Sequence, residues 1–369
     1  PRTNRLNHPV QPTGKLGFIS NFILNVMEIN IKLNGIRHKN LETLKNSVDS
    51  DITTFLQEWY DPKDHVIGHT SGSTGTPKEI RLLKKDMLAS ARLTNEFFNI
   101  CPSSNLLLCL SPNYIAGKMM IVRTILSGAN LVTVKPSSSP LQNIEEDIDF
   151  AAMVPMQVIT SLSSPETATK LAHIKQIIIG GAAVSPTLEQ QLQQIPTACY
   201  GTYGMTETVS HIALRQINGG KRSPYYFALG KVTFEKDERE CLIIHAPHLQ
   251  QQTFVTNDII QLTDATHFEW LGRHDNVINS GGIKLFPEKI ESRIAPLIPQ
   301  RFFITSEPDS RLGQKAVLVI ESASWSATEC QKLLRQLRSC QSPYEIPKDI
   351  YFQEHFSETY SGKIVRKIK

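Results

Sequence analysis

The sequence predicts an α/β fold with a large N-terminal domain of mostly parallel sheets with helices, a β subdomain, and a small α+β C-terminal domain. Three changes of pattern along the 369 residues support this prediction. Short apolar runs alternate with longer amphipathic runs from about residue 65, closely spaced strands follow from about residue 225, and a third pattern begins after Gly272. A chain of this length can form one large domain and a smaller one.

Alternation of strands and helices defines the first part. The expected strands are 105–111, 129–135, 149–155, 174–180 and 198–204, and the expected helices are 84–100, 118–126, 157–163 and 186–195. Strands separated by helices favour a mostly parallel sheet with helices packed on it. Such sheets present ligand-binding loops at the carboxyl ends of their strands.

The second and third parts have different patterns. The expected strands of the β subdomain are 241–246, 252–255, 259–262 and 267–271, with no long helix between them. Beyond Gly272, Pro287 opens an expected helix over 288–297, and a strand (316–321), a helix (326–339) and a final strand (349–353) follow. We therefore expect an N-terminal domain over residues 1–274 and a C-terminal domain over 275–369.

Composition and charge exclude several classes of protein. The formal net charge is +4, with 20% charged and 40% hydrophobic residues, and no Lys/Arg-rich run suggests a nucleic-acid partner. The six cysteines form no CxxC pair, which favours reduced thiols in a cytoplasmic protein. No uninterrupted apolar run could cross a bilayer, so we expect no stable membrane insertion. The sequence leaves a homo-oligomer open.

A loop rich in glycine and hydroxyl side chains is the strongest local signal. Residues 69–78 read HTSGSTGTPK. Glycines allow backbone N–H groups to approach a phosphate closely, hydroxyls add donors, and lysine adds a point charge. The loop is neither a Walker A motif nor GxGxxG. A plain flexible loop is the alternative, and the residues alone predict only a polyphosphate site.

Five segments in order resemble one family. They are 70–78 (TSGSTGTPK), 203–207 (YGMTE), 256–258 (TND), 272–291 (GRHD, then SGG and PEKIE) and 361–363 (SGK). The set resembles the adenylate-forming superfamily of acyl-CoA synthetases, luciferases and peptide-synthetase adenylation domains. Residues 203–215, 154–157 (VPMQ) and 180–183 (GGAA) are more narrowly similar to o-succinylbenzoate–CoA ligases of menaquinone biosynthesis.

Some positions depart from the family pattern. The phosphate loop begins near residue 70, which implies a shortened N-terminal subdomain, and Glu79 replaces a glycine. Tyr114 stands where the family has an aromatic residue or histidine, and Asn257 replaces the glycine of TGD. The family's GEL-type segment has no clear match, with 240–242 at best a remnant. None of these changes removes a charge that the chemistry needs.

The resemblance implies a two-step reaction with ATP, Mg²⁺ and coenzyme A. A carboxylate attacks the α-phosphate of ATP to give acyl-AMP and pyrophosphate, and the CoA thiol then displaces AMP. Lys363 and Thr206 are the expected catalytic residues that contact the α-phosphate, and Glu207 is expected both to act in catalysis and to hold Mg²⁺. The expected cradle for the β- and γ-phosphates is Thr70, Ser71, Gly72, Ser73, Thr74, Gly75 and Lys78.

The resemblance also implies the remaining contacts. Asp258 is expected at the ribose hydroxyls and Arg273 at ribose or phosphate. Asp275 falls at a hinge about which a mobile small domain rotates, so that Gly281 and Gly282 meet the CoA arm. The residues expected to flank adenine and the acyl group are Gly180, Gly181, Ala182, Tyr200, Gly201 and Tyr203. The residues expected to recognise a small carboxylic acid are Tyr114, Lys118, Ser210 and His211, with Gly180 beside them.

Each residue alone has an ordinary alternative. Asp258 or Arg273 alone would read as a surface charge, Lys363 as part of a solvated tail, and His211 as a structural histidine. Three other functions compete: a ligase of the same fold for a benzoate-like or fatty acid, a non-catalytic nucleotide-binding module, and a kinase-like phosphotransferase that releases ADP. The ordered set of motifs favours the acid–CoA ligase, with o-succinylbenzoate as the expected acid.

Overall fold

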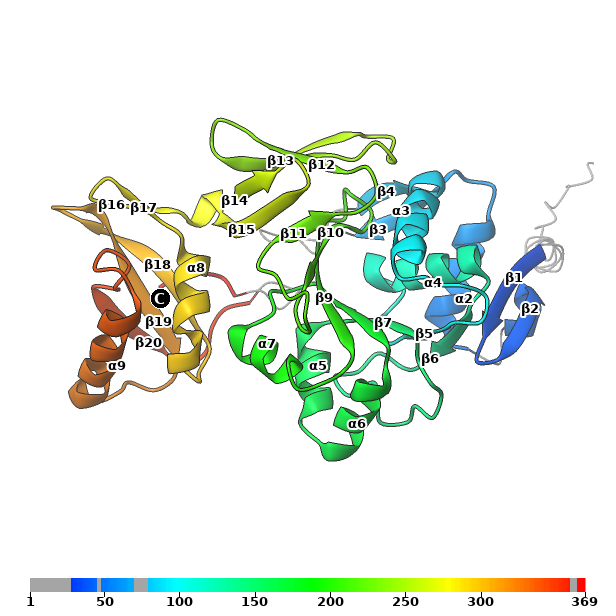
Figure 1. Cartoon of the computed structure of the whole chain (residues 1–369), viewed down its shortest axis with the longest axis horizontal. Helices are drawn as coiled ribbons and strands as arrows, with labels where there is room; N and C mark the ends of the chain where they lie inside the picture. Colours follow the sequence, from blue (N-terminus) through cyan, green and yellow to red (C-terminus); the bar gives the residue numbers. More distant parts are fainter. Residues whose placement is uncertain (1–27, 45–47, 70–78, 359–363, 369) are drawn as a thin grey trace, which may run out of the picture.

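The computed structural model describes residues 28–44, 48–69, 79–358 and 364–368. One large sheet runs through the body of the molecule, and a smaller sheet with its own helices lies at one end (Figure 1). The predicted α/β fold class is confirmed, including the small α+β part after residue 272.

The parallel half of the large sheet holds the strands predicted from the alternating pattern. Its strands, in spatial order, are β9 (Ala198–Gly204), β8 (Gln176–Ile179), β7 (Phe150–Met153), β5 (Asn105–Leu108), β6 (Asn130–Thr133) and β1 (Glu28–Leu33), with β2 (Ile36–Asn40) antiparallel at the edge. Leu106, Leu107 and Ile177 are completely buried. Continuous apolar runs suit these strands because helices cover both faces of the sheet.

Two apolar cores flank this half of the sheet. Leu106 belongs to the first core and Leu107 to the second, because successive side chains of a strand point to opposite faces. The first core takes apolar residues from α2 (Ser50–Tyr60), α3 (Lys84–Phe97) and α4 (Ile115–Ser127). The second takes them from α5 (Pro155–Leu162), α6 (Pro165–His173) and α7 (Pro186–Leu192). The short helix η1 (Leu41–Leu44) and the hairpin of β3 (His65–His69) and β4 (Glu79–Leu83) complete this part.

The predicted β subdomain continues the same sheet. The antiparallel strands follow β9 in the order β10 (His211–Gln216), β11 (Tyr226–Ala228), β15 (His267–Arg273), β14 (Thr253–Asp264), β13 (Cys241–His245) and β12 (Thr233–Lys236). The two short strands expected over 252–262 form the single strand β14, whose register against β13 shifts between Val255 and Ile259. That irregularity accounts for the break in the sequence pattern.

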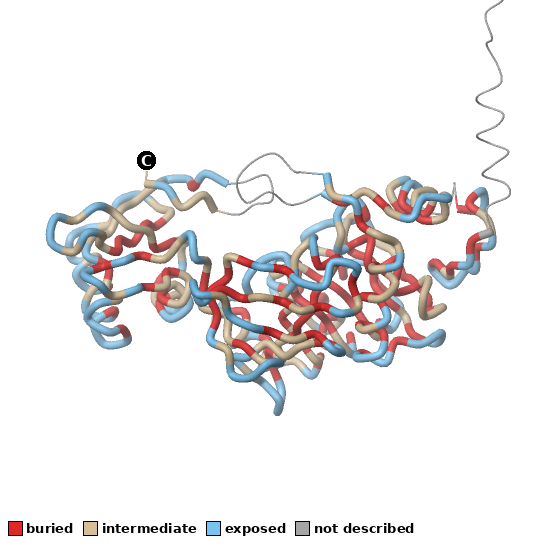
Figure 2. Tube along the Cα trace, turned by 90° about the horizontal axis from the view of Figure 1, so that it is seen from above, coloured by how far each residue is buried: buried red, intermediate tan, exposed pale blue. Residues whose placement is uncertain are grey.

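The smaller sheet has a core of its own. Its strands are β16 (Ile278–Ser280), β17 (Ile283–Leu285), β18 (Phe302–Asp309), β19 (Gly313–Glu321) and β20 (Asp349–Gln353), with helices η2 (His274–Asn276), α8 (Pro287–Ile294), η3 (Ala295–Leu297) and α9 (Ala327–Cys340). Buried residues such as Ile290, Leu318 and Leu333 form its core, and Figure 2 shows buried segments in both parts of the molecule. We propose a domain boundary between residues 274 and 275.

Candidate functional site

Eight of the predicted site residues lie outside the described residues. They are Thr70, Ser71, Gly72, Ser73, Thr74, Gly75 and Lys78 of the phosphate loop, and Lys363. Their roles stay predictions. The other predicted residues are described, and most follow the carboxyl ends of β8 and β9 or lie on the strands beside them.

The glycine turn after β8 lies against β9. Ile179 and Gly201 are register partners in the parallel pair, and Gly180 N donates to Met153 O at 3.1 Å. A Cβ added at Gly180 would lie 2.3 Å from Thr202 Oγ1, so a larger residue would force the Thr202 hydroxyl to move. Gly181 has a φ of +81°, in the left-handed region. Gly180 and Gly181 therefore form a turn at the carboxyl end of β8, beside Gly201 and Thr202 of β9. The contact of this turn and Ala182 with adenine stays a prediction.

The loop between β9 and β10 presents Thr206 and Glu207. Buried Thr208 holds it, because Thr208 Oγ1 accepts from Met205 N at 3.0 Å. Val209 N donates to Thr206 O at 2.9 Å, which closes the turn. Glu207 is exposed and forms no ion pair with another described residue. A free carboxylate at this position has the chemistry that a Mg²⁺ ion bound to phosphates prefers.

Tyr203, Asp258, Arg273 and Asp275 form one connected cluster. Tyr203 Oη donates to Asp258 Oδ2 at 2.6 Å. Arg273 Nη1 lies 3.5 Å from Asp258 Oδ1, and Arg273 Nη2 donates to Asp275 Oδ2 at 3.0 Å. Burial, together with the charge of Asp258, raises the pKa of Tyr203 well above its ordinary value, so Tyr203 remains a donor. The structure thus brings together four residues for which the sequence predicted a contact with adenine, with ribose or phosphate, or a place at the hinge.

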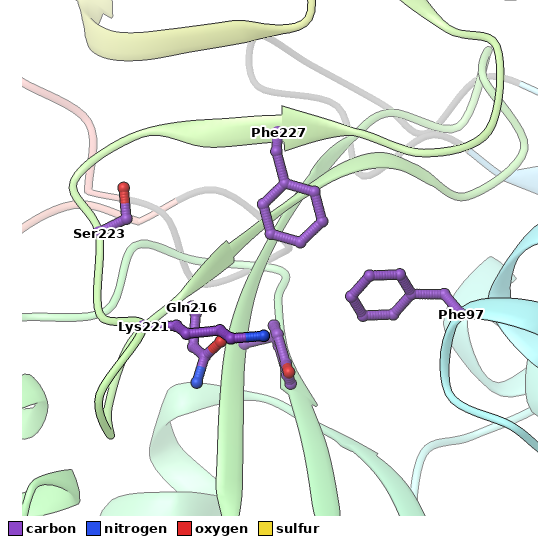
Figure 3. A pocket seen from close by; sticks show the side chains of 6 residues that line it. Phe97, Gln216, Lys221, Ser223 and Phe227 are labelled. Atoms are coloured by element: carbon purple, nitrogen blue, oxygen red, sulfur yellow. The ribbon is translucent and has the colours of Figure 1, made fainter.

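Tyr200 lies on the opposite face of β9 from Gly201 and Tyr203. Its ring meets the ring of Phe97 edge-on, with centroids 5.7 Å apart. It lines a cavity of about 290 Å³ together with Phe97, Gln216, Lys221, Ser223 and Phe227 (Figure 3). A contact between Tyr200 and adenine stays a prediction, and strand alternation places this ring on the other face.

A buried arginine that the sequence analysis missed lies beside the predicted acid-binding residues. Arg123 is 2% exposed, and its Nη2 donates to Ser210 Oγ at 2.8 Å. Its Nε has no hydrogen-bond partner, and no carboxylate pairs with it among the described residues. Burial lowers the pKa of Arg123 to about 9, which leaves the guanidinium charged at neutral pH. A single arginine in the apolar helix IAGKMMIVRTILS was the available signal.

His211 lies next to Ser210 and extends its polar contacts. Its Nδ1 lies 3.3 Å from Ser210 Oγ, and its Nε2 lies 3.3 Å from Thr94 Oγ1. Burial, reinforced by the charge of Arg123, lowers the pKa of His211 well below its ordinary value. His211 is therefore neutral at pH 7 and can serve as donor or acceptor.

Lys118 and Tyr114 occupy different environments on α4. Lys118 is 6% exposed; its Nζ donates to Glu58 Oε2 at 3.2 Å and lies 4.6 Å from the centroid of the Phe55 ring. Tyr114 precedes the helix and is half exposed. Lys118 thus already has a carboxylate partner, and its contact with substrate stays a prediction.

Gly281 and Gly282 form the turn between β16 and β17. Both have positive φ, 58° and 83°, and Gly281 N donates to Leu312 O at 2.8 Å. An added Cβ at Gly282 would meet nothing within 4 Å. The turn belongs to the smaller sheet, so its contact with coenzyme A stays a prediction.

Comparison with known families identifies the chain's family. Residues 26–235, more than half of the 369, match the family model described as AMP-binding enzyme. The chain belongs to the AMP-binding enzyme family. An acyl-CoA synthetase (AMP-forming)/AMP-acid ligase II-like protein from Dyadobacter fermentans is 38% identical, with a TM-score of 0.61 over 89% of this chain and 95% of that one. The predicted superfamily, and an enzyme of the AMP-forming acid–CoA ligase class, are confirmed.

Other relatives of this AMP-binding enzyme are similar at lower identity. A 2-succinylbenzoate–CoA ligase from Enterococcus faecalis is 26% identical over 346 residues, which cover 84% of this chain and 70% of that protein. The structure of O-succinylbenzoate coenzyme A synthetase from Bacillus subtilis with ATP and magnesium ion is 20% identical, with a TM-score of 0.67 over 81% of this chain and 68% of that one. The latter likeness concerns the fold.

Two findings concern metals and membranes. The described residues contain no cluster of three or more His, Cys, Asp or Glu side chains placed to hold a metal ion. In the same part of the AMP-binding enzyme, none of the helices combines the length and apolar character that crossing a bilayer requires. Among the predicted residues, Glu207 alone was expected to hold a metal.

Proposed function

We propose that this AMP-binding enzyme converts o-succinylbenzoate to o-succinylbenzoyl-CoA. One carboxylate oxygen attacks the α-phosphorus of ATP and expels pyrophosphate. The sulfur of CoA then attacks the acyl carbon and expels AMP, and the thiol proton is released. Similarity to 2-succinylbenzoate–CoA ligases supports the choice of acid.

Residues at the carboxyl ends of the strands support the first step. Thr206 would donate to the α-phosphate, and Asp258, held by Tyr203, would accept from the ribose hydroxyls. Glu207 would hold Mg²⁺, which offsets the negative charge of the phosphates. Lys363 would bridge the reacting carboxylate and the α-phosphate. The proposed hinge at Asp275 would let Gly281 and Gly282 reach the pantetheine arm.

The observation that carries the choice of acid is the unpaired guanidinium of Arg123. Burying a charge without a partner is costly, so a partner that arrives with the substrate would offset that cost. o-Succinylbenzoate has two carboxylates, of which only one reacts. The second would bind near Ser210, whose Oγ accepts from Arg123 Nη2, and near His211, whose Nδ1 lies 3.3 Å from the same oxygen. A monocarboxylic acid would leave the arginine unpaired.

The test is pyrophosphate release from ATP and Mg²⁺ with a panel of acids, with and without coenzyme A. The panel includes o-succinylbenzoate, benzoate and a fatty acid, and is repeated with Arg123→Met. We expect release with o-succinylbenzoate, thioester only when coenzyme A is present, and an increase in KM of about ten-fold or more in Arg123→Met.

Three outcomes would contradict the proposal in different ways. A preference for another acid would keep the reaction class and reject the substrate. ATP binding without release from any acid would favour a non-catalytic nucleotide-binding module. ADP as a product would favour a phosphotransferase.

A further inference from the structure

A largely buried ion pair connects α7, the helix after the glycine turn, to the antiparallel half of the sheet. Glu189 lies in the first turn of α7, and Arg215 lies on β10. Arg215 Nη2 pairs with Glu189 Oε1, and the two side chains are 14% and 15% exposed. A buried ion pair gives little net stability, because the cost of removing both charges from water offsets their attraction. The positions that the pair connects therefore say more about its role than its contribution to stability does.

The pair spans β9 at Gly201. Arg215 and Gly201 are register partners in the β9–β10 pair. A Cβ placed on Gly201 would lie 3.9 Å from Arg215 Nε and 3.8 Å from Tyr226 Oη. These are ordinary van der Waals distances, so the Arg215 side chain lies directly beside the β9 backbone at Gly201.

A short connection links α7 to the glycine turn. Only Val184 and Ser185 separate the 180–183 turn from the helix. Ser185 Oγ accepts from Leu188 N at 3.2 Å and so caps the helix. A displacement of Glu189 would therefore move Gly180 and Gly181 relative to Gly201.

The same arginine reaches the Tyr203–Asp258 pair through one aromatic ring. Arg215 Cζ lies 5.8 Å from the centroid of the Tyr226 ring. The Tyr226 ring lies 5.8 Å from the Tyr203 ring, edge to face. Tyr203 in turn donates to Asp258. The residues expected at adenine and those expected at ribose thus share Arg215 as a common support.

We propose that Glu189 and Arg215 are positioning residues of the nucleotide site. The pair fixes the spacing between the glycine turn and β9, where the adenine ring would insert, and supports Tyr203 through Tyr226. This inference rests on the proposed function, since it assumes that ATP binds at these elements. It assigns neither residue a contact with the reacting atoms.

Two residues of the same region provide matched controls. Arg222 Nη2 lies 3.5 Å from Glu189 Oε2, but its side chain is 55% exposed, so its loss should matter little. Gln193 Nε2 donates to Ile217 O at 3.1 Å and holds the other end of α7. Gln193 Nε2 also donates to the backbone oxygen of Glu189 at 2.6 Å. Gln193→Ala therefore removes two bonds to backbone oxygens at α7 and leaves the charged groups of Glu189 and Arg215 paired.

The experiment measures the Kd of ATP by calorimetry, KM and kcat by pyrophosphate release, and Tm, all with the full chain. For Glu189→Gln and Arg215→Met we expect the Kd and KM of ATP to rise about ten-fold, with the KM of the acid and kcat at saturating ATP within about two-fold. Arg215→Lys should give an intermediate effect, because lysine keeps the charge but not the planar fork. Arg222→Met should match the wild type, and Gln193→Ala should lower Tm with a smaller loss of ATP affinity than either variant of the ion pair.

The results separate this proposal from the proposed function. A wild-type chain that binds no ATP would overturn both. If the wild type binds ATP and the two variants bind it equally well, only the positioning role is rejected. It is also rejected if the variants lose ATP affinity, acid affinity and kcat in the same proportion as Gln193→Ala, since that pattern reports general destabilisation.

Discussion

Tyr203 donates its hydroxyl hydrogen to Asp258 across 2.6 Å, linking the strand before the YGMTE loop to the strand that carries the TND segment. The carboxylate is only 12% exposed and has Arg273 as a second partner at 3.5 Å. A buried carboxylate needs such donors to offset the cost of its removal from water and to fix its orientation. The pair therefore holds the oxygens that we expect at the ribose.

Replacing Tyr203 by phenylalanine should weaken ATP binding. The change removes one hydrogen bond to a charged group, an interaction of about 1.5–3 kcal/mol, and leaves Asp258 oriented by Arg273 alone. We expect a loss of stability of that order in urea denaturation and a rise of about three- to ten-fold in the Kd of ATP.

Tyr351→Phe is the control for that substitution. Tyr351 Oη donates to Glu307 Oε2 at 2.9 Å within the smaller sheet. Tyr351→Phe should change stability alone. Equal ATP affinity in Tyr203→Phe and the wild type would reject the role of Tyr203 in holding Asp258.

Replacing Lys118 by methionine should separate a structural role from substrate recognition. Removing one partner of a buried pair leaves the other charge uncompensated, and here Glu58 would lose Lys118 Nζ. Because Glu58 keeps 27% exposure, we expect a cost of about 1–3 kcal/mol, below that of a fully buried pair.

The double variant Glu58→Gln/Lys118→Met should recover part of that stability, since no charge is then left unpaired. A KM for the acid equal to the wild-type value in both stable variants would assign Lys118 to the fold. An increase in KM beyond the effect of Glu58→Gln alone would support the predicted contact with substrate.

The pattern of apolar residues predicted many of the helices and strands. The surroundings of the site residues depend on contacts between residues that are far apart in the sequence. Apolar runs located β5 to β8 because each run forms a strand buried on both faces, whereas β9 is only partly buried. The sequence could not show that Lys118 meets Glu58, sixty residues earlier, or that Tyr200 and Tyr203 lie on opposite faces of β9 in different surroundings. Arg123 was missed because a charge in an apolar helix resembles a surface residue until its burial is known.

The sequence pattern also did not predict how the parallel strands connect to the antiparallel ones. β10 lies largely within residues 203–215, which were matched to o-succinylbenzoate–CoA ligases, and β11 follows in a stretch where the sequence predicted no element. They join the predicted parallel sheet to the predicted β subdomain, so one sheet carries both. Alternation predicts which residues form strands, but the partner of each edge depends on the whole fold.

Neutral His211 should make the protein less stable in acid. Its folded-state pKa is lowered, first by burial and then by Arg123, so below its ordinary value of 6.5 the unfolded chain takes up the proton more readily. Its contribution is therefore complete above pH 6.5 and is lost as pH falls toward the folded-state pKa, by at most about 1.4 kcal/mol per pH unit.

His211→Gln should reduce the slope of unfolding free energy against pH below 6.5. The exposed His355 provides the control, and His355→Gln should leave the slope unchanged. Urea denaturation between pH 5 and pH 7.5 measures both slopes. A His211→Gln slope equal to that of the wild type would contradict the assignment of a buried, neutral His211.

The cysteines should react with Ellman's reagent in an order set by exposure and pKa. Cys101 is exposed, and hydrogen bonds from Ser103 and Ser104 lower its pKa, so it should react first at neutral pH. Cys340 is also exposed and should follow. Burial raises the pKa values of Cys109 and Cys199 to about 12, so these thiols should react only when the chain unfolds. Cys101→Ser should remove the fastest phase of the reaction, and Cys340→Ser should retain it. Rapid labelling of Cys199 in the native protein would contradict this order. It would show that β9, the strand that carries Cys199, opens to solvent far more often than its buried position indicates.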